Sequence, residues 1–99
     1  MSSVMFSVSY QVRPEKRNDY LAYVRELRER LRSNGDRRYD VYRAKGNENL
    51  FTEIYYSDSE EEIDALEENM DEETRSLLGK IEDCMEKGTT RYTTMMELE

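Results

Sequence analysis

The sequence predicts an α+β fold in which four strands and two helical regions follow the order β-α-β-β-α-β. Three observations predict it. Residues 4–12 alternate in apolar character with a period of two. Two longer segments repeat apolar residues every three or four positions, and two short strand-like runs joined by a glycine-containing loop lie between those segments. We expect residues 1–99 to form one domain.

The run from Val4 to Val12 alternates with a period of two, which is typical of a half-buried strand. One face carries Val4, Phe6, Val8, Tyr10 and Val12, and the other carries Met5, Ser7, Ser9 and Gln11. We expect the valine-rich face to meet the helices. Pro14 then ends the strand, because proline biases its preceding residue toward extended geometry and suits a first helical turn.

A helix is predicted from Glu15 to Ser33, followed by a stop at Asn34-Gly35. Its apolar stripe consists of Tyr20, Val24, Leu27 and Leu31. Acidic residues near its start and arginines near its end match the helix dipole.

A hairpin follows, with strands from Tyr39 to Ala44 and from Leu50 to Tyr56 around a loop of residues 45–49. Both faces of its second strand carry apolar side chains. We expect Leu50, Ile54 and Tyr56 to face the helices, because they form the more aliphatic face. Phe51, Glu53 and Tyr55 would then lie on the opposite face of the sheet.

The second helical region starts at Ser59, which forms a capping-box pattern with Glu62, and is predicted to end at Gly88. The segment 69–73 interrupts its apolar stripe, so we expect a break or a shift there. The closing run, Thr90 to Glu99, alternates again and predicts the fourth strand.

Two helices on one face of a four-stranded antiparallel sheet form a ferredoxin-like arrangement, which leaves the other face of the sheet without cover. Only 36% of the residues are hydrophobic and 38% are charged, so the core of one chain is small. We therefore expect a homodimer in which two sheets stack. The residues predicted for that dimer face are Met5, Phe51, Glu53, Tyr55 and Met95.

Composition also argues against several kinds of site. The net charge of -8 disfavours nucleic acid as a partner, because an acidic protein repels phosphate. The chain has no histidine and one cysteine, Cys84, whose acidic neighbours would raise its thiol pKa. We predict no metal site and no cofactor. No apolar run is long enough to span a bilayer, so we expect no membrane partner and a cytoplasmic location.

Three segments resemble the dimeric α/β-barrel superfamily, and within it the antibiotic-biosynthesis-monooxygenase-like and NIPSNAP-like proteins. They are Phe51-Thr52-Glu53-Ile54-Tyr55, the run Asp71-Glu72-Glu73-Thr74-Arg75-Ser76-Leu77-Leu78, and Gly88-Thr89-Thr90-Arg91. The resemblance implies two sheets paired into a barrel, often with a small-molecule pocket between sheet and helices. Relatives commonly carry a tryptophan where Tyr55 stands and a histidine in the following helix, which has no counterpart here. The resemblance to the haem-degrading branch is therefore one of fold only.

Glu53 is the candidate for chemistry. In an enclosed pocket its pKa would rise and it could act as a general base. The alternative is a structural ion pair with Arg43 or Arg91, across the sheet or across a dimer. Pocket candidates are the tyrosines Tyr10, Tyr20, Tyr23, Tyr42 and Tyr56, which could equally fill the core.

Three interpretations of function follow. The first is a homodimeric module that binds a small aromatic or hydrophobic molecule or serves a regulatory role. The alternative is a cofactor-independent monooxygenase-like or isomerase-like enzyme using Glu53 and a tyrosine. A pure protein-interaction domain is a third interpretation.

Overall fold

A computed structural model describes residues 3–33, 38–66 and 68–98. Its elements, in chain order, are β1 (Val4–Gln11), the 3-10 turn η1 (Pro14–Lys16), α1 (Arg17–Ser33), β2 (Arg38–Arg43), β3 (Leu50–Ser57), α2 (Glu60–Asp64), α3 (Glu72–Asp83) and β4 (Arg91–Met96). The predicted element order is confirmed, with the second helical region divided in two.

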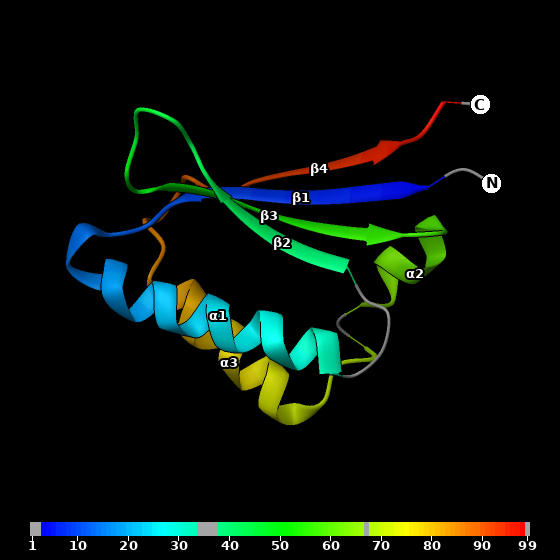
Figure 1. Ribbon diagram of the computed structural model, residues 1–99, viewed down its shortest axis with the longest axis horizontal. Helices are drawn as coiled ribbons and strands as arrows, with labels where there is room; N and C mark the ends of the chain where they lie inside the picture. Colours follow the sequence, from blue (N-terminus) through cyan, green and yellow to red (C-terminus); the bar gives the residue numbers. More distant parts are fainter. Residues whose placement is uncertain (1–2, 34–37, 67, 99) are drawn as a thin grey trace.

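The four strands form one antiparallel sheet in the order β2-β3-β1-β4, which confirms the ferredoxin-like arrangement. Figure 1 shows α1 and α3 side by side beneath one face of this sheet, and α2 near the end of β3. The opposite face, called the open face below, is covered by no helix of the described residues. The core therefore lies between the helices and a single face of the sheet.

Helix α1 follows the predicted stripe, since Tyr20, Val24, Leu27 and Leu31 are its buried residues. Pro14 begins the 3-10 turn that leads into it, as the sequence predicts. The predicted stop at Asn34-Gly35 lies outside the described residues.

The second helical region breaks where its apolar stripe is interrupted. Ser59 caps α2, its Oγ accepting from the backbone N–H of Glu62 at 3.2 Å, but Glu62 itself accepts from Ser57 Oγ at 2.5 Å. The predicted end at Gly88 is wrong, because α3 ends at Asp83. The chain then becomes extended, with the N–H of Glu86 donating to the carbonyl of Gln11 at 2.8 Å. Gly88, at φ 78°, belongs to the turn before β4.

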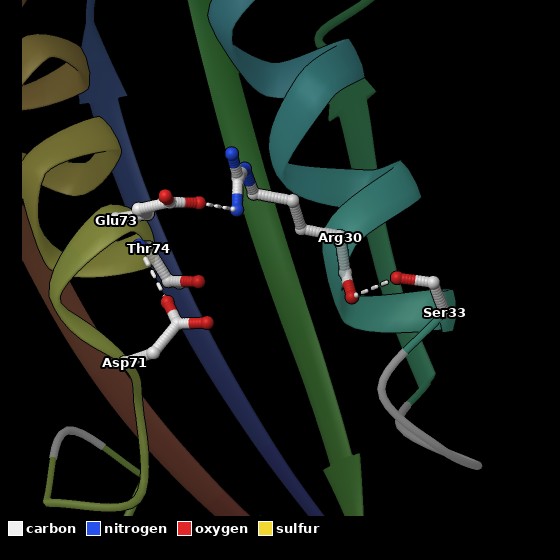
Figure 2. A network of polar contacts seen from close by, with 5 residues as sticks. All are labelled: Arg30, Ser33, Asp71, Glu73 and Thr74. Carbon is white, nitrogen blue, oxygen red and sulfur yellow. Dashed lines mark hydrogen bonds and ion pairs between the residues drawn. The ribbon is translucent and has the colours of Figure 1, made fainter.

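Polar contacts join the end of α1 to the start of α3 (Figure 2). Arg30 donates to Oε2 of Glu73 at 2.9 Å, and Asp71 Oδ1 accepts from the backbone N–H of Thr74 at 2.8 Å. Hydrogen bonds from the side chain and then from the backbone N–H of Thr74 lower the pKa of the Asp71 carboxyl. Thr74 and Leu77 are buried beside these exposed polar contacts. The apolar contact between the two helices therefore contributes most of their packing energy, and the exposed ion pair mainly helps to fix their relative orientation.

The predicted orientation of β3 is wrong. Opposite partners in the antiparallel ladder point to the same side, and Phe51 pairs with Tyr10 while Glu53 pairs with Val8. Because the valine-rich face of β1 meets the helices as predicted, Phe51, Glu53 and Tyr55 face the helices too and are buried. Leu50, Ile54 and Tyr56 lie on the open face instead. The alternation within β3 could not decide between two faces that are both apolar.

Three of the five predicted dimer-face residues, Phe51, Glu53 and Tyr55, are therefore in the core rather than on the open face. Met5 and Met95 do lie on the open face, where they are opposite partners on β1 and β4. Ser9 and Thr52 share a hydroxyl–hydroxyl hydrogen bond of 2.5 Å on the same face.

Candidate functional site

Glu53 is a buried carboxyl group in the middle of the sheet, with only 3% of its surface exposed. Tyr10 on β1 donates its hydroxyl to Oε2 at 2.6 Å, and Tyr39 on β2 donates to Oε1 at 2.5 Å. The hydroxyl of Tyr55 lies 3.5 Å from Oε1. The predicted alternative of an ion pair with Arg43 or Arg91 is wrong, because tyrosine hydroxyls take the place of a cation.

This environment changes the protonation of Glu53. Burial raises the pKa of its carboxyl, and the hydrogen bonds from Tyr10, Tyr39 and Tyr55 offset only part of that increase. Burial, followed by the negative charge of Glu53, raises the pKa of Tyr10 and Tyr39. The two tyrosines therefore remain protonated donors, and Glu53 is the group whose charge can change.

The hydrogen bonds extend to helix α1 through Tyr20. Its hydroxyl lies 2.7 Å from that of Tyr10, and the two rings meet edge to face with centroids 5.8 Å apart. Tyr20, Tyr10, Glu53 and Tyr39 thus form a continuous chain of hydroxyl and carboxyl groups, called the tyrosine–glutamate cluster below. It links α1 to three adjacent strands.

A cavity of about 570 Å³ lies beside Glu53, between the helix-facing side of the sheet and helices α2 and α3. Its apolar and aromatic lining comprises Phe6, Val8, Tyr55, Ile63, Leu66, Met70, Leu78, Ile81, Met85 and Tyr92. Charged residues also contribute, namely Glu53, Asp64, Glu82, Glu86 and Lys87. Of these acids only Glu53 is buried, so a carboxyl group with a raised pKa belongs to the buried part of the wall, whereas the other acids that line the cavity are exposed.

Aromatic rings form one side of this central cavity. Phe6 stacks on Tyr92 with an interplanar angle of 13°, and its other ring neighbour, Tyr55, lies at 36°, both at centroid distances of 6.1 Å. Tyr92 was not among the predicted pocket residues, and 68% of its surface is exposed. Tyr92 lies in the cavity wall because it pairs with Val8 across β1 and β4. These two residues are far apart in the sequence, so no local pattern predicts the pairing.

The predicted pocket tyrosines separate into two groups. Tyr10 and Tyr20 are fully buried in the tyrosine–glutamate cluster, behind the cavity wall rather than in it. Tyr23, Tyr42 and Tyr56 lie elsewhere. Tyr23 lies on α1 beneath Lys80, whose Nζ is 5.8 Å from the ring centroid.

Tyr42 and Tyr56 are wrong as pocket residues because their alternation places them on the open face. Tyr42 is 54% exposed, and Arg38 lies over the Tyr56 ring at 4.6 Å. Neither residue lines the central cavity.

Cys84 is buried at the end of α3, and burial is the main cause that raises the pKa of its thiol. Within residues 3–33, 38–66 and 68–98, no three His, Cys, Asp or Glu side chains are grouped so that they could hold a metal ion. None of the helices in these described ranges is both long and apolar enough to cross a membrane.

A sequence model described as antibiotic biosynthesis monooxygenase (ABM) matches residues 3–69. The chain belongs to this family. The ABM match includes the entire tyrosine–glutamate cluster, whereas α3 and β4, which complete the cavity, follow it in the chain. No match was found among curated protein sequences.

Solved structures with low sequence identity share the ABM fold of this chain. A conserved protein from Methanosarcina mazei is 19% identical with a TM-score of 0.81, over 96% of this chain and 92% of the other. A candidate antibiotic biosynthesis monooxygenase from Caulobacter crescentus is 16% identical with a TM-score of 0.79, over 99% and 92%. A protein from Mycobacterium tuberculosis is 14% identical with a TM-score of 0.77, over 98% and 96%.

Proposed function

We propose that this ABM-family protein binds a small aromatic or hydrophobic molecule in the central cavity and that Glu53 engages a hydroxyl group of that molecule. The observation that carries the proposal is a buried carboxyl of raised pKa in the wall of a cavity of about 570 Å³. Cavities for small ligands typically measure about 300 to 1,000 Å³ and combine an apolar lining with a few polar groups.

The lining indicates the shape of the ligand. Phe6 and Tyr92 offer ring faces against which a flat molecule can pack, while Ile63, Leu78 and Ile81 supply aliphatic surface from the helices. Glu53 is the buried polar group that could fix orientation. A phenol or an enol satisfies both requirements, since its hydroxyl can donate to the carboxylate while its ring remains in apolar surroundings.

We also propose that two copies pair through their open faces. Met5, Met95 and Ile54 lie there at least partly exposed, and stacking two such faces would remove their apolar surface from water. Sedimentation at micromolar concentration should give twice the chain mass of 11.9 kDa. A stable monomer under those conditions would contradict the pairing.

Cofactor-independent oxygenation is the second candidate function. It is favoured by the position of Glu53 in the cavity wall, by its raised pKa, which makes the carboxylate a stronger base, and by the family name. In such a reaction Glu53 would remove the proton of a phenol whose ring bears a methylene group. The resulting anion would react with dioxygen, the CH₂ becoming C=O with one oxygen atom and the other oxygen leaving as water with both hydrogens.

A panel of quinols and polycyclic phenols tests both candidates. Calorimetry should show binding to the wild type and weaker binding to Glu53→Gln, whereas Glu86→Gln, at an exposed acid of the same cavity, should behave like the wild type. Oxygen consumption that disappears in Glu53→Gln would support catalysis. Turnover unaffected by that substitution would remove Glu53 from the mechanism, and an absence of binding across the panel would contradict the ligand class.

A further inference from the structure

A second groove, of about 430 Å³, lies between α1 and β2, away from the central cavity. Four arginines and four apolar residues line it: Arg17, Arg25, Arg28 and Arg43, with Leu21, Val24, Val41 and Phe51. We infer that this arginine groove binds a small organic anion that carries an apolar body, such as an alkyl or aryl phosphate or carboxylate.

The backbone places the four guanidinium groups around one apolar floor. On α1 the groove residues recur at positions 17, 21, 24, 25 and 28, which is one face of a helix. On β2, Val41 and Arg43 alternate onto the helix-facing side, because Arg43 pairs with the buried Phe51. Phe51 and Val24 are buried and form the base of the groove.

Among the described residues, the charges of this groove are largely uncompensated. In that part of the chain only Arg28 pairs with a carboxylate, Asp40, at 3.5 Å, and both side chains are partly exposed. Arg17 donates to the backbone carbonyl of Glu48 at 3.3 Å. Among the carboxylates that the structure describes, none forms an ion pair with Arg17, Arg25 or Arg43.

The positive charge is concentrated in one part of the chain, and this limits the size of the anion that can bind. Residues 13–45 carry eleven Lys and Arg against six Asp and Glu, whereas the whole chain has a net charge of -8. A long polyanion would reach the acidic parts of the surface and be repelled. A short oxyanion can bind the arginine guanidinium groups, which donate paired N–H groups to phosphate or carboxylate. The hydrocarbon part of the same molecule can then pack on the apolar base of the groove.

Titration with n-octyl phosphate, followed by amide chemical shifts, tests the inference on the full chain. We expect shifts at the groove segments 17–28 and 41–43, and binding about tenfold or more weaker in Arg25→Gln/Arg43→Gln. The matched control is Arg32→Gln, an exposed arginine of the same helix outside the groove, which should bind like the wild type. Titration with octanoate shows whether the groove prefers a carboxylate head or a phosphate head. Inorganic phosphate and octanol each represent one half of octyl phosphate, and both should bind more weakly than octyl phosphate itself.

Several results would overturn the inference. One is an affinity for octyl phosphate and octanoate that the double substitution leaves unchanged. Another is a set of shifts confined to central-cavity residues such as Tyr92 and Leu78. A third is a change of oligomeric state in Arg25→Gln/Arg43→Gln, because the groove would then be a contact between copies. The first and third results leave the ligand proposed for the central cavity untouched, because the groove and that cavity share no lining residue. The second result would instead place the alkyl anion in the central cavity.

Discussion

The hydroxyl of Tyr10 donates to Oε2 of Glu53 at 2.6 Å, although the ladder pairs Tyr10 with Phe51 and Glu53 with Val8. The contact is therefore diagonal between neighbouring strands, and only a long side chain can make it. It gives a buried carboxyl a neutral donor in place of a cation. Glu53 is consequently held in position while its pKa stays raised.

Replacing Glu53 by Gln should change how stability depends on pH. Because the pKa of Glu53 is raised on folding, the native state binds more protons than the unfolded state above the unfolded pKa of about 4.3. Between the unfolded and the folded pKa, the free energy of unfolding of the wild type should fall by up to about 1.4 kcal/mol per pH unit relative to that of Glu53→Gln. Urea denaturation across this pH range measures the difference, and parallel curves for the two proteins would contradict a raised pKa.

Removing single hydroxyl groups from the tyrosine–glutamate cluster should destabilise the fold. We expect Tyr10→Phe and Tyr39→Phe each to lower the free energy of unfolding by about 1 to 3 kcal/mol near neutral pH, because the buried carboxyl loses a donor. Tyr42→Phe is the matched control, since Tyr42 is 54% exposed, and should change stability by less than about 0.5 kcal/mol. Equal effects at Tyr39 and Tyr42 would show that the hydrogen bond contributes little.

Tyr92→Ala separates ligand binding from folding. The side chain is 68% exposed, so its loss should change stability only slightly, yet it removes a ring that stacks on Phe6 in the cavity wall. We expect phenol binding about five- to tenfold weaker, as for the loss of one aromatic contact. Isothermal calorimetry measures the affinity for the phenol, and a thermal melt measures the stability of the fold. Leu98→Ala, at an exposed position of the same terminal segment, is the control and should change neither quantity. Unchanged binding in Tyr92→Ala would place the ligand elsewhere.

Leu27→Ala should be the most damaging of the substitutions considered. Leu27 is completely buried on α1, and truncating such a residue costs about 2 to 5 kcal/mol through lost burial and the cavity left behind. Leu21→Ala, at a half-buried position of the same helix, should cost less. Urea midpoints measure both variants, and a smaller effect at position 27 than at position 21 would contradict the packing described for α1.

Much of the fold could be predicted because it depends on local patterns. The stripe of Tyr20, Val24, Leu27 and Leu31 is confirmed residue by residue, as are the cap at Ser59 and the break in the second helical region. The end of that region could not be predicted from a local pattern. It depends on backbone bonds to β1, such as that from Glu86 to Gln11, which no neighbouring residue signals.

The sequence by itself determined the order of strands and helices and the helix-facing side of β1, and it singled out Glu53 as a carboxylate with tyrosines nearby in the sequence. Only the tertiary structure decided which side of β3 is buried, and hence that Tyr10 and Tyr39, rather than an arginine, bind Glu53. The physical reason is that both faces of β3 are apolar. Its orientation is therefore set by pairing with residues of β1 that lie 39 to 53 positions away along the chain, and no local periodicity encodes that pairing.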